Sequence, residues 1–272
     1  MTSTPPAAFF TPNLLRGRVA LITGGGTGIG RGIALAFASA GCDVAILSRS
    51  EDHLTGTVRE IEAYGVHALG VVADVRKAEQ VDAALTQVVD TLGQLDILVN
   101  GAAGNFLCAA ESLSPNGFGT VVDIDLKGTF NVCRAAFGHL SSHGGCILNI
   151  SATLQLLGTA GQVHASAAKA GVDALTRTLA VEWGPSRIRV NGVAPGPVDG
   201  TEGVRRLVSA EARRGIETRA PLQRLTTIDD IAATALFLCS DAAAFITGTT
   251  LVVDGGLWLR SADALGAAEP GA

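Results

Sequence analysis

The sequence predicts an α/β fold, namely a single-domain, Rossmann-like, doubly wound parallel sheet of about seven strands with helices on both faces. Three observations predict it. Short apolar, β-rich segments alternate with helix-length segments, a glycine-rich turn joins the first strand to the first helix, and no linker or change of composition interrupts residues 16–260. Alternation at this spacing is typical of parallel strands joined by right-handed helical crossovers.

Composition narrows the class of protein. The chain has 272 residues, of which 47% are hydrophobic and 17% charged, so it can bury a sizeable core. The net charge of −5 is modest and no cluster of basic residues occurs, so no nucleic-acid partner is expected. No apolar run reaches the ~20 residues that cross a bilayer, so no membrane partner is expected. The five cysteines form no CxxC pair, which disfavours disulfides and any metal site, and the cytoplasm is the expected compartment.

The first half of the chain is expected to contain four strands and the three helices that connect them. An N-terminal arm at residues 1–15 precedes the domain at 16–260, and a C-terminal tail occupies 261–272. Each expected strand is apolar and β-rich, and each expected helix has helical spacing of its apolar residues. The strands are expected at 19–23, 43–48, 67–72 and 95–100, with helices ending at 40 and spanning 51–64 and 77–92.

The second half continues the alternation but contains an insertion. One long helix is expected over 114–139, with Ser114 as its N-cap, and glycines 144 and 145 break the pattern before the next strand. Residues 198–220 carry arginines and helical spacing without a strand pattern, which predicts an inserted lid. The remaining elements are strands at 146–150, 188–194 and 249–253 and helices at 163–183 and 227–239.

Glycines 24, 28 and 30 lie between the first strand and the first helix. Positions without a side chain let backbone N–H groups and the helix N-terminus approach a pyrophosphate. Taken alone, this spacing is also compatible with a structural turn. Its place in an alternating α/β chain favours a dinucleotide site.

The end of the second strand indicates which dinucleotide is bound. Its sequence is Ser48-Arg49-Ser50, with an arginine where an NAD site places an acid. A guanidinium would bind a 2′-phosphate, so NADPH is favoured over NADH. The alternative is that Arg49 is solvated and that Glu51 or Asp52 supplies the acid.

Two further segments lie at the carboxyl edge of the sheet, where ligands of this architecture bind. Asp74 ends the third strand and is placed to hydrogen-bond the adenine, and the small residues 100–104 follow the fourth strand. Either segment could instead serve turn geometry alone.

Residues 151–171 join a buried strand to a helix that carries Lys169. A carbonyl reductase of this general build has a tyrosine four residues before the lysine and a hydroxyl thirteen residues before that. Here these positions hold Ala165 and Ala152, and the only tyrosine is Tyr64. A Tyr-Lys pair therefore does not protonate an alkoxide in this protein.

The strings TGGGTGIG, NGAAG, NGVAPGPV and VVDGG resemble the short-chain dehydrogenase/reductase family over residues 14–259. Within that family, the strings AAGNFL, DID, GQVHASAAKAG and APGPVDGTEGVRRL resemble the 2,4-dienoyl-CoA reductase branch. The resemblance implies NADPH-dependent reduction of a conjugated dienoyl-CoA thioester to a 3-enoyl thioester, in a homotetramer.

The resemblance implies that Asp125 and Lys169 are catalytic residues, and the chemistry of the reaction adds Asn105. Hydride addition to a conjugated thioester makes a dienolate, which needs electrostatic stabilisation and then a proton on carbon rather than a hydroxyl acid on oxygen. Lys169 would bind the nicotinamide ribose, Asn105 or a ribose hydroxyl would donate to the thioester oxygen, and Asp125 would position or protonate a water. Asp125 could instead be exposed, or paired with Lys127 or Arg134.

The remaining site residues follow from the same reasoning and resemblance. The expected cofactor-binding residues are Gly24, Gly26, Thr27, Gly28, Ile29, Gly30, Arg49, Ser50, Asp74, Val75, Asn100, Ala102, Lys169, Pro195, Gly196, Val198 and Thr201. The expected substrate-binding residues are Asn105, Phe106, Ser114, Asn116 and Arg206. Arg205 and Arg206 suit the phosphates of coenzyme A, or else form a solvated helix face. His164 is expected to cap or pack rather than to catalyse.

Two other functions stay open at this point. The chain could reduce another activated enoyl or carbonyl compound on a different carrier. It could also be a non-catalytic NADPH-binding protein, because hydroxyl groups are missing at positions 152 and 165.

Overall fold

A computed structural model describes residues 11 and 13–260, so most of the expected arm and the whole expected tail lie outside the described residues. One seven-stranded sheet forms the centre, with strand order β3-β2-β1-β4-β5-β6-β7 and parallel pairing throughout. This confirms the predicted fold class. The strands are β1 (Val19–Thr23), β2 (Asp43–Ser48), β3 (Ala68–Val72), β4 (Ile97–Asn100), β5 (Gly145–Ile150), β6 (Ile188–Pro195) and β7 (Thr250–Val253).

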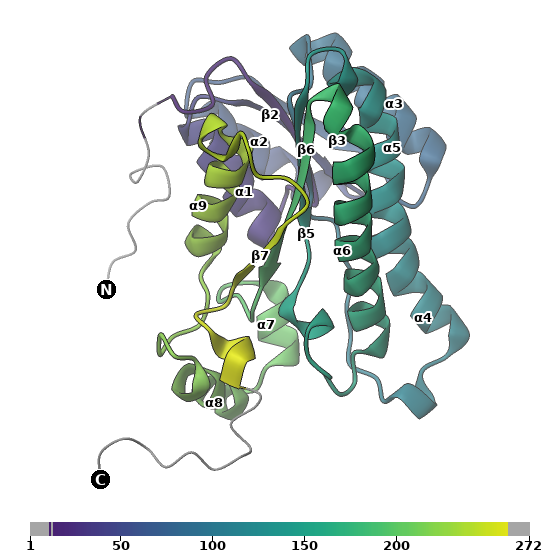
Figure 1. Cartoon of the computed structure of the whole chain (residues 1–272), viewed down its shortest axis with the longest axis vertical. Coiled ribbons are helices and arrows are strands. Elements are labelled where there is room, and N and C mark those ends of the chain that lie inside the picture. Colours follow the sequence, from purple (N-terminus) through teal and green to yellow (C-terminus); the bar gives the residue numbers. More distant parts are fainter. Residues whose placement is uncertain (1–10, 12, 261–272) are drawn as a thin grey trace.

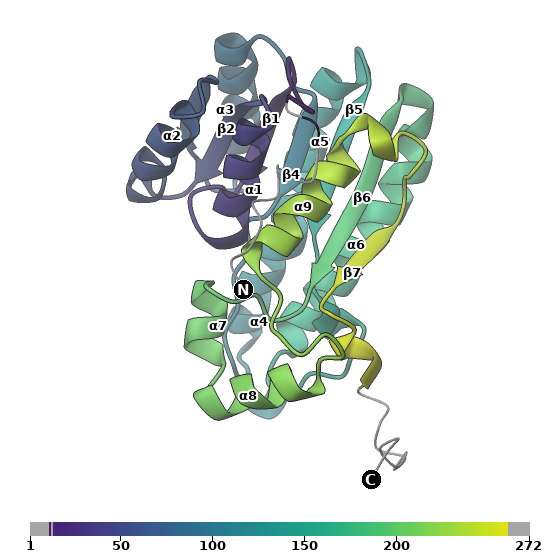
Figure 2. The same ribbon diagram turned by 90° about the vertical axis from the view of Figure 1, so that its left-hand side faces the viewer.

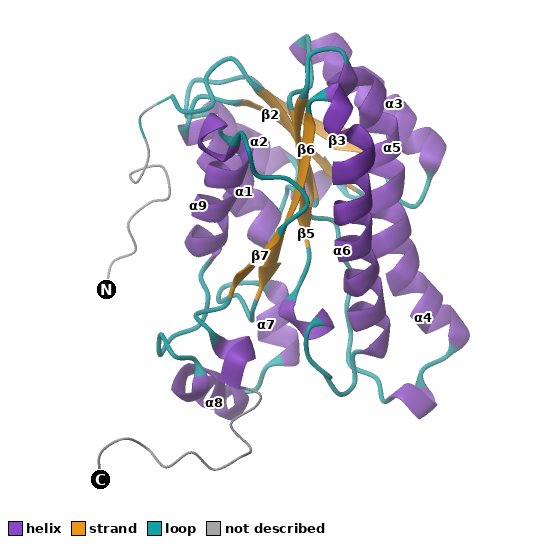
Figure 3. Cartoon of the chain, in the orientation of Figure 1, coloured by secondary structure: helices purple, strands orange, loops and turns teal. Residues whose placement is uncertain are grey.

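Helices cover both faces of the sheet, as Figures 1 and 3 show. One face carries α1 (Gly28–Ser39), α2 (Thr55–Glu62) and α9 (Ile228–Cys239), and the other carries α3 (Ala78–Leu92), α5 (Gly128–Ser141) and α6 (Val163–Trp183). The strand order reverses between β1 and β4, and in open α/β sheets ligands bind at the carboxyl ends of the strands beside such a switch point.

Each central strand contributes to two cores, because successive side chains point to opposite faces of a sheet. Ile22 and Val99 belong to the apolar cluster under α1 and α9, whereas Leu21 and Leu98 belong to the cluster under α3 and α5. All four are fully buried. Burial on both faces explains why these strands are continuous apolar runs without a polar alternation.

The expected single helix over 114–139 is interrupted, so that prediction was wrong. The chain forms α4 (Pro115–Val122), then a π-helical turn at Asp123–Lys127, then α5. The π turn carries one residue more than an α turn and places Asp125 inward, where it is 2% exposed. Such turns are frequent at functional sites. No local signal in the residues 123–127 distinguishes the turn from a continuous helix.

The inserted segment after β6 folds as two short helices, α7 (Glu202–Leu207) and α8 (Ala210–Arg219), which lie below the carboxyl edge of the sheet (Figure 2). Arg213 on α8 binds Asp199 through both guanidinium nitrogens, with N···O distances of 2.7 and 2.6 Å. The Arg213 guanidinium lowers the pKa of Asp199 below its ordinary value of 3.8. This ion pair therefore ties the insertion to the end of β6.

Replacing Asp199 by asparagine is expected to loosen α8. The folded-state pKa of Asp199 is depressed, so its contribution is present above the unfolded value of 3.8 and is lost as pH falls through the folded value. At neutral pH, amide exchange in residues 202–219 should rise by up to about fivefold in the variant, because exposed ion pairs are weak. The difference from wild type should shrink below pH 3.8. Equal exchange at neutral pH would contradict the role of this pair.

Candidate active site

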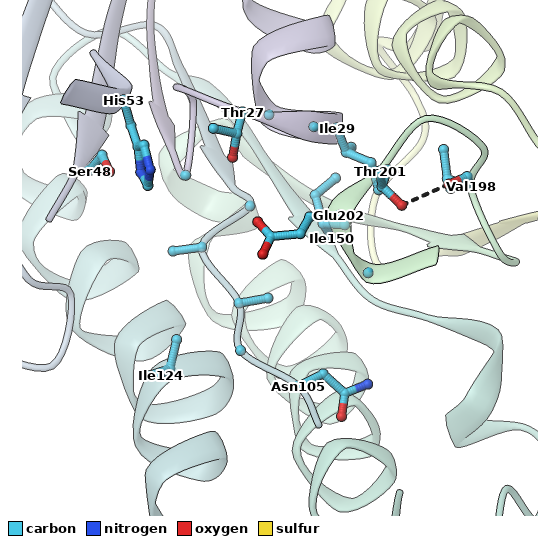
Figure 4. Close-up of a pocket in the computed structure, with 18 of the residues that line it drawn as sticks. Thr27, Ile29, Ser48, His53, Asn105, Ile124, Ile150, Val198, Thr201 and Glu202 are labelled. Atoms are coloured by element: carbon cyan, nitrogen blue, oxygen red, sulfur yellow. Dashed lines mark hydrogen bonds between the residues drawn. The ribbon is translucent and has the colours of Figure 1, made fainter. Parts of the chain in front are cut away.

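A cavity of about 710 Å³ opens at the carboxyl edge of the sheet (Figure 4). The turn after β1, the ends of β2, β3, β4 and β5, and the insertion on α7 all contribute to its wall. This is the place that the strand order predicts for a dinucleotide.

Among the described residues, no group of three metal-ligating side chains occurs. No helix in the described part of the chain is long and apolar enough to span a membrane.

The glycine turn after β1 has the shape that a pyrophosphate needs. A Cβ on Gly30 would lie 2.3 Å from the Gly24 carbonyl oxygen, and one on Gly24 would lie 2.9 Å from the Gly101 oxygen. Gly28 has φ +52° and opens α1, whose N-cap Thr27 makes no side-chain cap hydrogen bond. Backbone N–H groups at this helix N-terminus are therefore directed at the cavity, where they can bind an anion.

The far end of the cavity is lined by Ser48, Arg49 and Asp74. Arg49 is exposed, and no ion pair joins it to another described residue. Glu51 and Asp52 form an exposed 3₁₀ turn and do not line the cavity. Arg49 forms no ion pair with Asp74, whose carboxylate binds Arg76, and a guanidinium at the β2 end has the charge to bind a 2′-phosphate.

Asp74 has a partner that the sequence analysis did not anticipate. Both of its carboxylate oxygens accept hydrogen bonds from the Arg76 guanidinium, the shortest at 2.5 Å between Nη2 and Oδ2. This hydrogen bonding lowers the pKa of Asp74. An ionised carboxylate remains an acceptor, so Asp74 can still accept a hydrogen bond from an adenine amine.

The centre of the site is a buried ion pair. Lys169 Nζ lies 3.2 Å from Asp125 Oδ2 and donates to the Ile150 carbonyl oxygen at 2.8 Å. Asp125 Oδ1 accepts the Gly104 N–H at 2.8 Å. The two side chains are 10% and 2% exposed. An ammonium has three N–H donors. The Ile150 oxygen accepts one of them, and the ion pair with Asp125 fixes the position of the ammonium.

This arrangement overturns the alternatives for Asp125. It is neither exposed nor paired with Lys127, which binds Asp123 at 3.8 Å, nor with Arg134, which binds Asp82 at 2.9 Å. Asp125 does not itself line the cavity, whereas Lys169 does. Asp125 therefore influences the cavity through its ion pair with Lys169.

The expected substrate residues divide into two groups. Asn105 and Arg206 line the cavity, but Phe106, Ser114 and Asn116 do not. Ser114 instead caps α4 by accepting the Gly117 N–H at 3.0 Å. Phe106 packs on His164, with ring centroids 4.4 Å apart. His164 is fully buried and packs, as expected.

The loop after β4 is joined to the start of α6. Asn105 Nδ2 donates to Gln162 Oε1 at 2.5 Å, and the Cys108 N–H donates to the Gly161 oxygen at 2.9 Å. The Phe106 and His164 rings meet between these two bonds. The loop therefore forms one fixed wall of the cavity, and it carries Asn105 on that wall.

Most of the expected cofactor residues line the cavity, and four do not. Those that line it are Gly24, Thr27, Gly28, Ile29, Gly30, Arg49, Asp74, Val75, Ala102, Lys169, Gly196, Val198 and Thr201. The four that do not are Gly26, Ser50, Asn100 and Pro195. Gly26 serves packing, because a Cβ there would lie 2.1 Å from the His53 oxygen. Asn100 lies beneath the wall and donates to Asn149 Oδ1 at 2.8 Å.

The sequence analysis missed three polar lining residues, which are His53, Ser151 and Glu202. His53 lies in the 3₁₀ turn after β2, and Glu202 begins α7 with its carboxylate directed into the cavity (Figure 4). Neither position follows a recognisable motif. Ser151 directly precedes the position where a hydroxyl was sought, so extending that search by one residue would have found it.

Comparison with known proteins gives consistent results. A family model described as enoyl-(acyl carrier protein) reductase matches residues 24–258. A peroxisomal 2,4-dienoyl-CoA reductase, (3E)-enoyl-CoA-producing, of Arabidopsis thaliana is 49% identical over 260 residues, which cover 92% of this chain and 87% of that protein. A crystal structure of a short chain dehydrogenase from Bacillus anthracis has a TM-score of 0.83 and 42% identity, and the match covers 88% and 96% of the two chains.

A 7α-hydroxysteroid dehydrogenase, complexed with NADH and 7-oxo glycochenodeoxycholic acid, has a TM-score of 0.87 at 32% identity, and the match covers 90% of this chain and 96% of that one. The shared fold and the glycine turn at the cavity support a nicotinamide cofactor. From the family match over residues 24–258, the two similar structures and the parallel sheet with its cavity, we conclude that the chain belongs to the short-chain dehydrogenase/reductase family of oxidoreductases.

Proposed function

We propose that this protein is an NADPH-dependent reductase of 2,4-dienoyl-CoA thioesters, which it converts to 3-enoyl-CoA in the degradation of unsaturated fatty acids. The observation that carries the proposal is the buried Lys169–Asp125 pair in a site without a tyrosine. The relative of Arabidopsis thaliana, 49% identical to this chain, bears the name of this activity.

The site is suited to stabilising negative charge on an oxygen rather than to protonating it. NADPH, when bound, supplies the hydride. The Lys169 ammonium, held by the Ile150 oxygen and Asp125, puts a fixed positive charge at the cavity wall. Asn105 offers an amide N–H from the opposite loop. Fixed donors of this kind stabilise a developing dienolate without reorganising.

Binding groups for the rest of the ligands lie at the two ends of the cavity. Gly24, Gly28 and Gly30 would hold the pyrophosphate of the cofactor, with Arg49 at its 2′-phosphate. Arg206 on α7 would bind a coenzyme A phosphate, in exchange for its exposed pair with Glu202. Phe106, Ser114 and Asn116 would act on the substrate path only indirectly, because they do not line the cavity.

The preference for NADPH is tested at Arg49. In Arg49→Ala the ratio of kcat/KM with NADPH to kcat/KM with NADH should fall roughly 10- to 100-fold, the size of one charge-assisted hydrogen bond. The matched control is Arg59→Ala, an exposed arginine on α2 outside the cavity, which should keep the wild-type ratio. A wild-type enzyme with equal kcat/KM for NADH and NADPH would contradict the assignment of Arg49 to the 2′-phosphate.

We also propose a homotetramer. Support comes from large apolar side chains left exposed on helices and loops, namely Phe130 on α5 at 46%, Val181 on α6 at 80%, and Phe245 after α9 at 105%. The sedimentation coefficient at working protein concentration tests the tetramer, and the value of a monomer would contradict it. The cytoplasm stays the predicted compartment.

The proposed reaction is tested by following NADPH oxidation with 2,4-hexadienoyl-CoA and, in parallel, with a simple ketone. We expect turnover of the thioester and little turnover of the ketone. Turnover of a different enoyl or carbonyl compound, with the dienoyl thioester untouched, would favour the alternative reductase. NADPH binding without reduction of any substrate in the panel would favour a non-catalytic protein.

A further inference from the structure

Ser151 presents a hydroxyl group that no other part of the described chain uses. The residue directly follows β5, is 3% exposed, and lines the cavity next to Ile150 and Lys169. Its backbone N–H donates to the Val193 oxygen at 2.7 Å, which fixes the backbone at this point. The Oγ atom has no hydrogen-bond partner among the described residues.

Ser151 lines the cavity together with the residue before it, Ile150, and not with the residue after it. Ala152 has φ −161° and ψ 155°, an extended conformation. Ser151 is among the lining residues and Ala152 is not. The strand end therefore offers a hydroxyl one residue before the position where carbonyl reductases of this build carry theirs.

A buried hydroxyl without a partner is unfavourable, because the fold removes it from water and returns no hydrogen bond. Alanine would fit the same space without that cost. Ser166 shows the ordinary case nearby, since its Oγ donates to the Leu154 oxygen at 3.2 Å. The hydroxyl of Ser151 has no partner although the residue lines the cavity, and this points to a ligand atom as its partner.

The charge that develops in the proposed reaction defines that ligand atom. A dienolate places negative charge on the thioester oxygen, and its stabilisation requires donors around that oxygen. One N–H of Asn105 is already taken by Gln162, and the Lys169 ammonium has two partners in the chain. Ser151 is the hydroxyl donor on the same wall as Lys169.

We propose that Ser151 is a further catalytic residue, whose Oγ–H donates a hydrogen bond to the thioester oxygen of the substrate. This hydrogen bond becomes stronger as the dienolate forms. This inference rests on the proposed function. It assigns to position 151 the donor role that the missing hydroxyls at 152 and 165 leave open, while the proton on carbon still comes from elsewhere.

The test compares Ser151→Ala with wild type and with Ser166→Ala as the matched control, using 2,4-hexadienoyl-CoA and NADPH. We expect kcat/KM of Ser151→Ala to fall roughly 10²-fold, as for the loss of one oxyanion donor. The Kd for NADPH should not change, and the Tm should stay equal or rise, because an unpartnered hydroxyl is removed. Ser151→Thr keeps the hydroxyl and should restore most of the activity, and Ser166→Ala should keep it.

The outcomes separate this inference from the reaction itself. If wild type reduces the thioester and Ser151→Ala matches it, the role of Ser151 is wrong and the reaction stands. A raised Kd for NADPH in Ser151→Ala would place the hydroxyl on the cofactor and also overturn the proposal. A falling Tm together with failed rescue by threonine would indicate a structural role. If the wild-type enzyme does not turn over the thioester, both the proposed reaction and the role of Ser151 are wrong.

Discussion

Lys169→Met is expected to lower kcat/KM by about 10³-fold or more and to destabilise the fold by about 3–5 kcal/mol. The substitution removes the positive charge from the cavity wall, the hydrogen bond to the Ile150 oxygen and the ion pair with Asp125. Asp125 would keep only the Gly104 N–H as a partner while staying 2% exposed. A buried carboxylate that loses its cation carries most of its desolvation cost uncompensated.

The lysine on the π turn provides a matched control. Lys127 pairs with Asp123 at 3.8 Å, but both side chains are more than half exposed. Lys127→Met should therefore change activity little and stability by less than about 0.5 kcal/mol. Steady-state kinetics, a Kd for NADPH and denaturant unfolding of the two variants supply the comparison. Wild-type turnover by Lys169→Met would exclude the lysine from the mechanism.

The strands were predictable because each is a local apolar segment with a defined end. All seven expected strands are present, and most ends agree to within one or two residues, for example β1 at Val19–Thr23 and β7 at Thr250–Val253. The glycine turn was predictable for the same reason, because Gly24 and Gly30 have no room for a side chain. Local sterics and local periodicity fix these features, and both are encoded in a short stretch of sequence.

The long helix was harder to predict because the π turn is set by tertiary contacts. A Cβ on Gly128 would lie 2.6 Å from Val75 Cγ2, and Asn131 Nδ2 donates to the Val75 carbonyl oxygen at 2.9 Å. These contacts depend on the β3 end and on where α5 packs, and neither is visible in the helical pattern. The partner of Asp125 was missed for the same reason, because Lys169 lies 44 positions further on, as the numbering shows (169 − 125 = 44).

Which side chains line a cavity depends on small rotations at strand and helix ends. Ser151 lines the cavity and the next residue, Ala152, does not, and Phe106 packs on His164 while Asn105 lines the cavity. A sequence motif locates such a loop in the fold, but it does not determine which of the loop's side chains line the cavity. The site could therefore be located from sequence, whereas the division into residues that contact ligands and residues that support them required the coordinates.

Asp125→Asn is expected to lower kcat about 10²-fold and to raise the Kd for NADPH, because Asp125 acts through Lys169 and not on the substrate. The amide oxygen can still accept the Gly104 N–H, but the charge opposite the Lys169 ammonium is lost. The ammonium would then no longer be held beside the Ile150 oxygen at the cavity wall. Asp123→Asn, an exposed acid on the same π turn, is the matched control and should retain activity.

A double-mutant cycle decides between positioning and direct proton transfer. If Asp125 serves only to position Lys169, the Asp125→Asn/Lys169→Met enzyme should be no slower than Lys169→Met alone, because both substitutions disable one unit. The double variant should also recover part of the stability that Lys169→Met loses, since no uncompensated carboxylate remains buried. If the losses in kcat instead multiply, and the Kd for NADPH in Asp125→Asn equals that of wild type, the carboxylate acts on the substrate by itself. The first result is the one that the geometry favours, because Lys169 lines the cavity and Asp125 lies behind it.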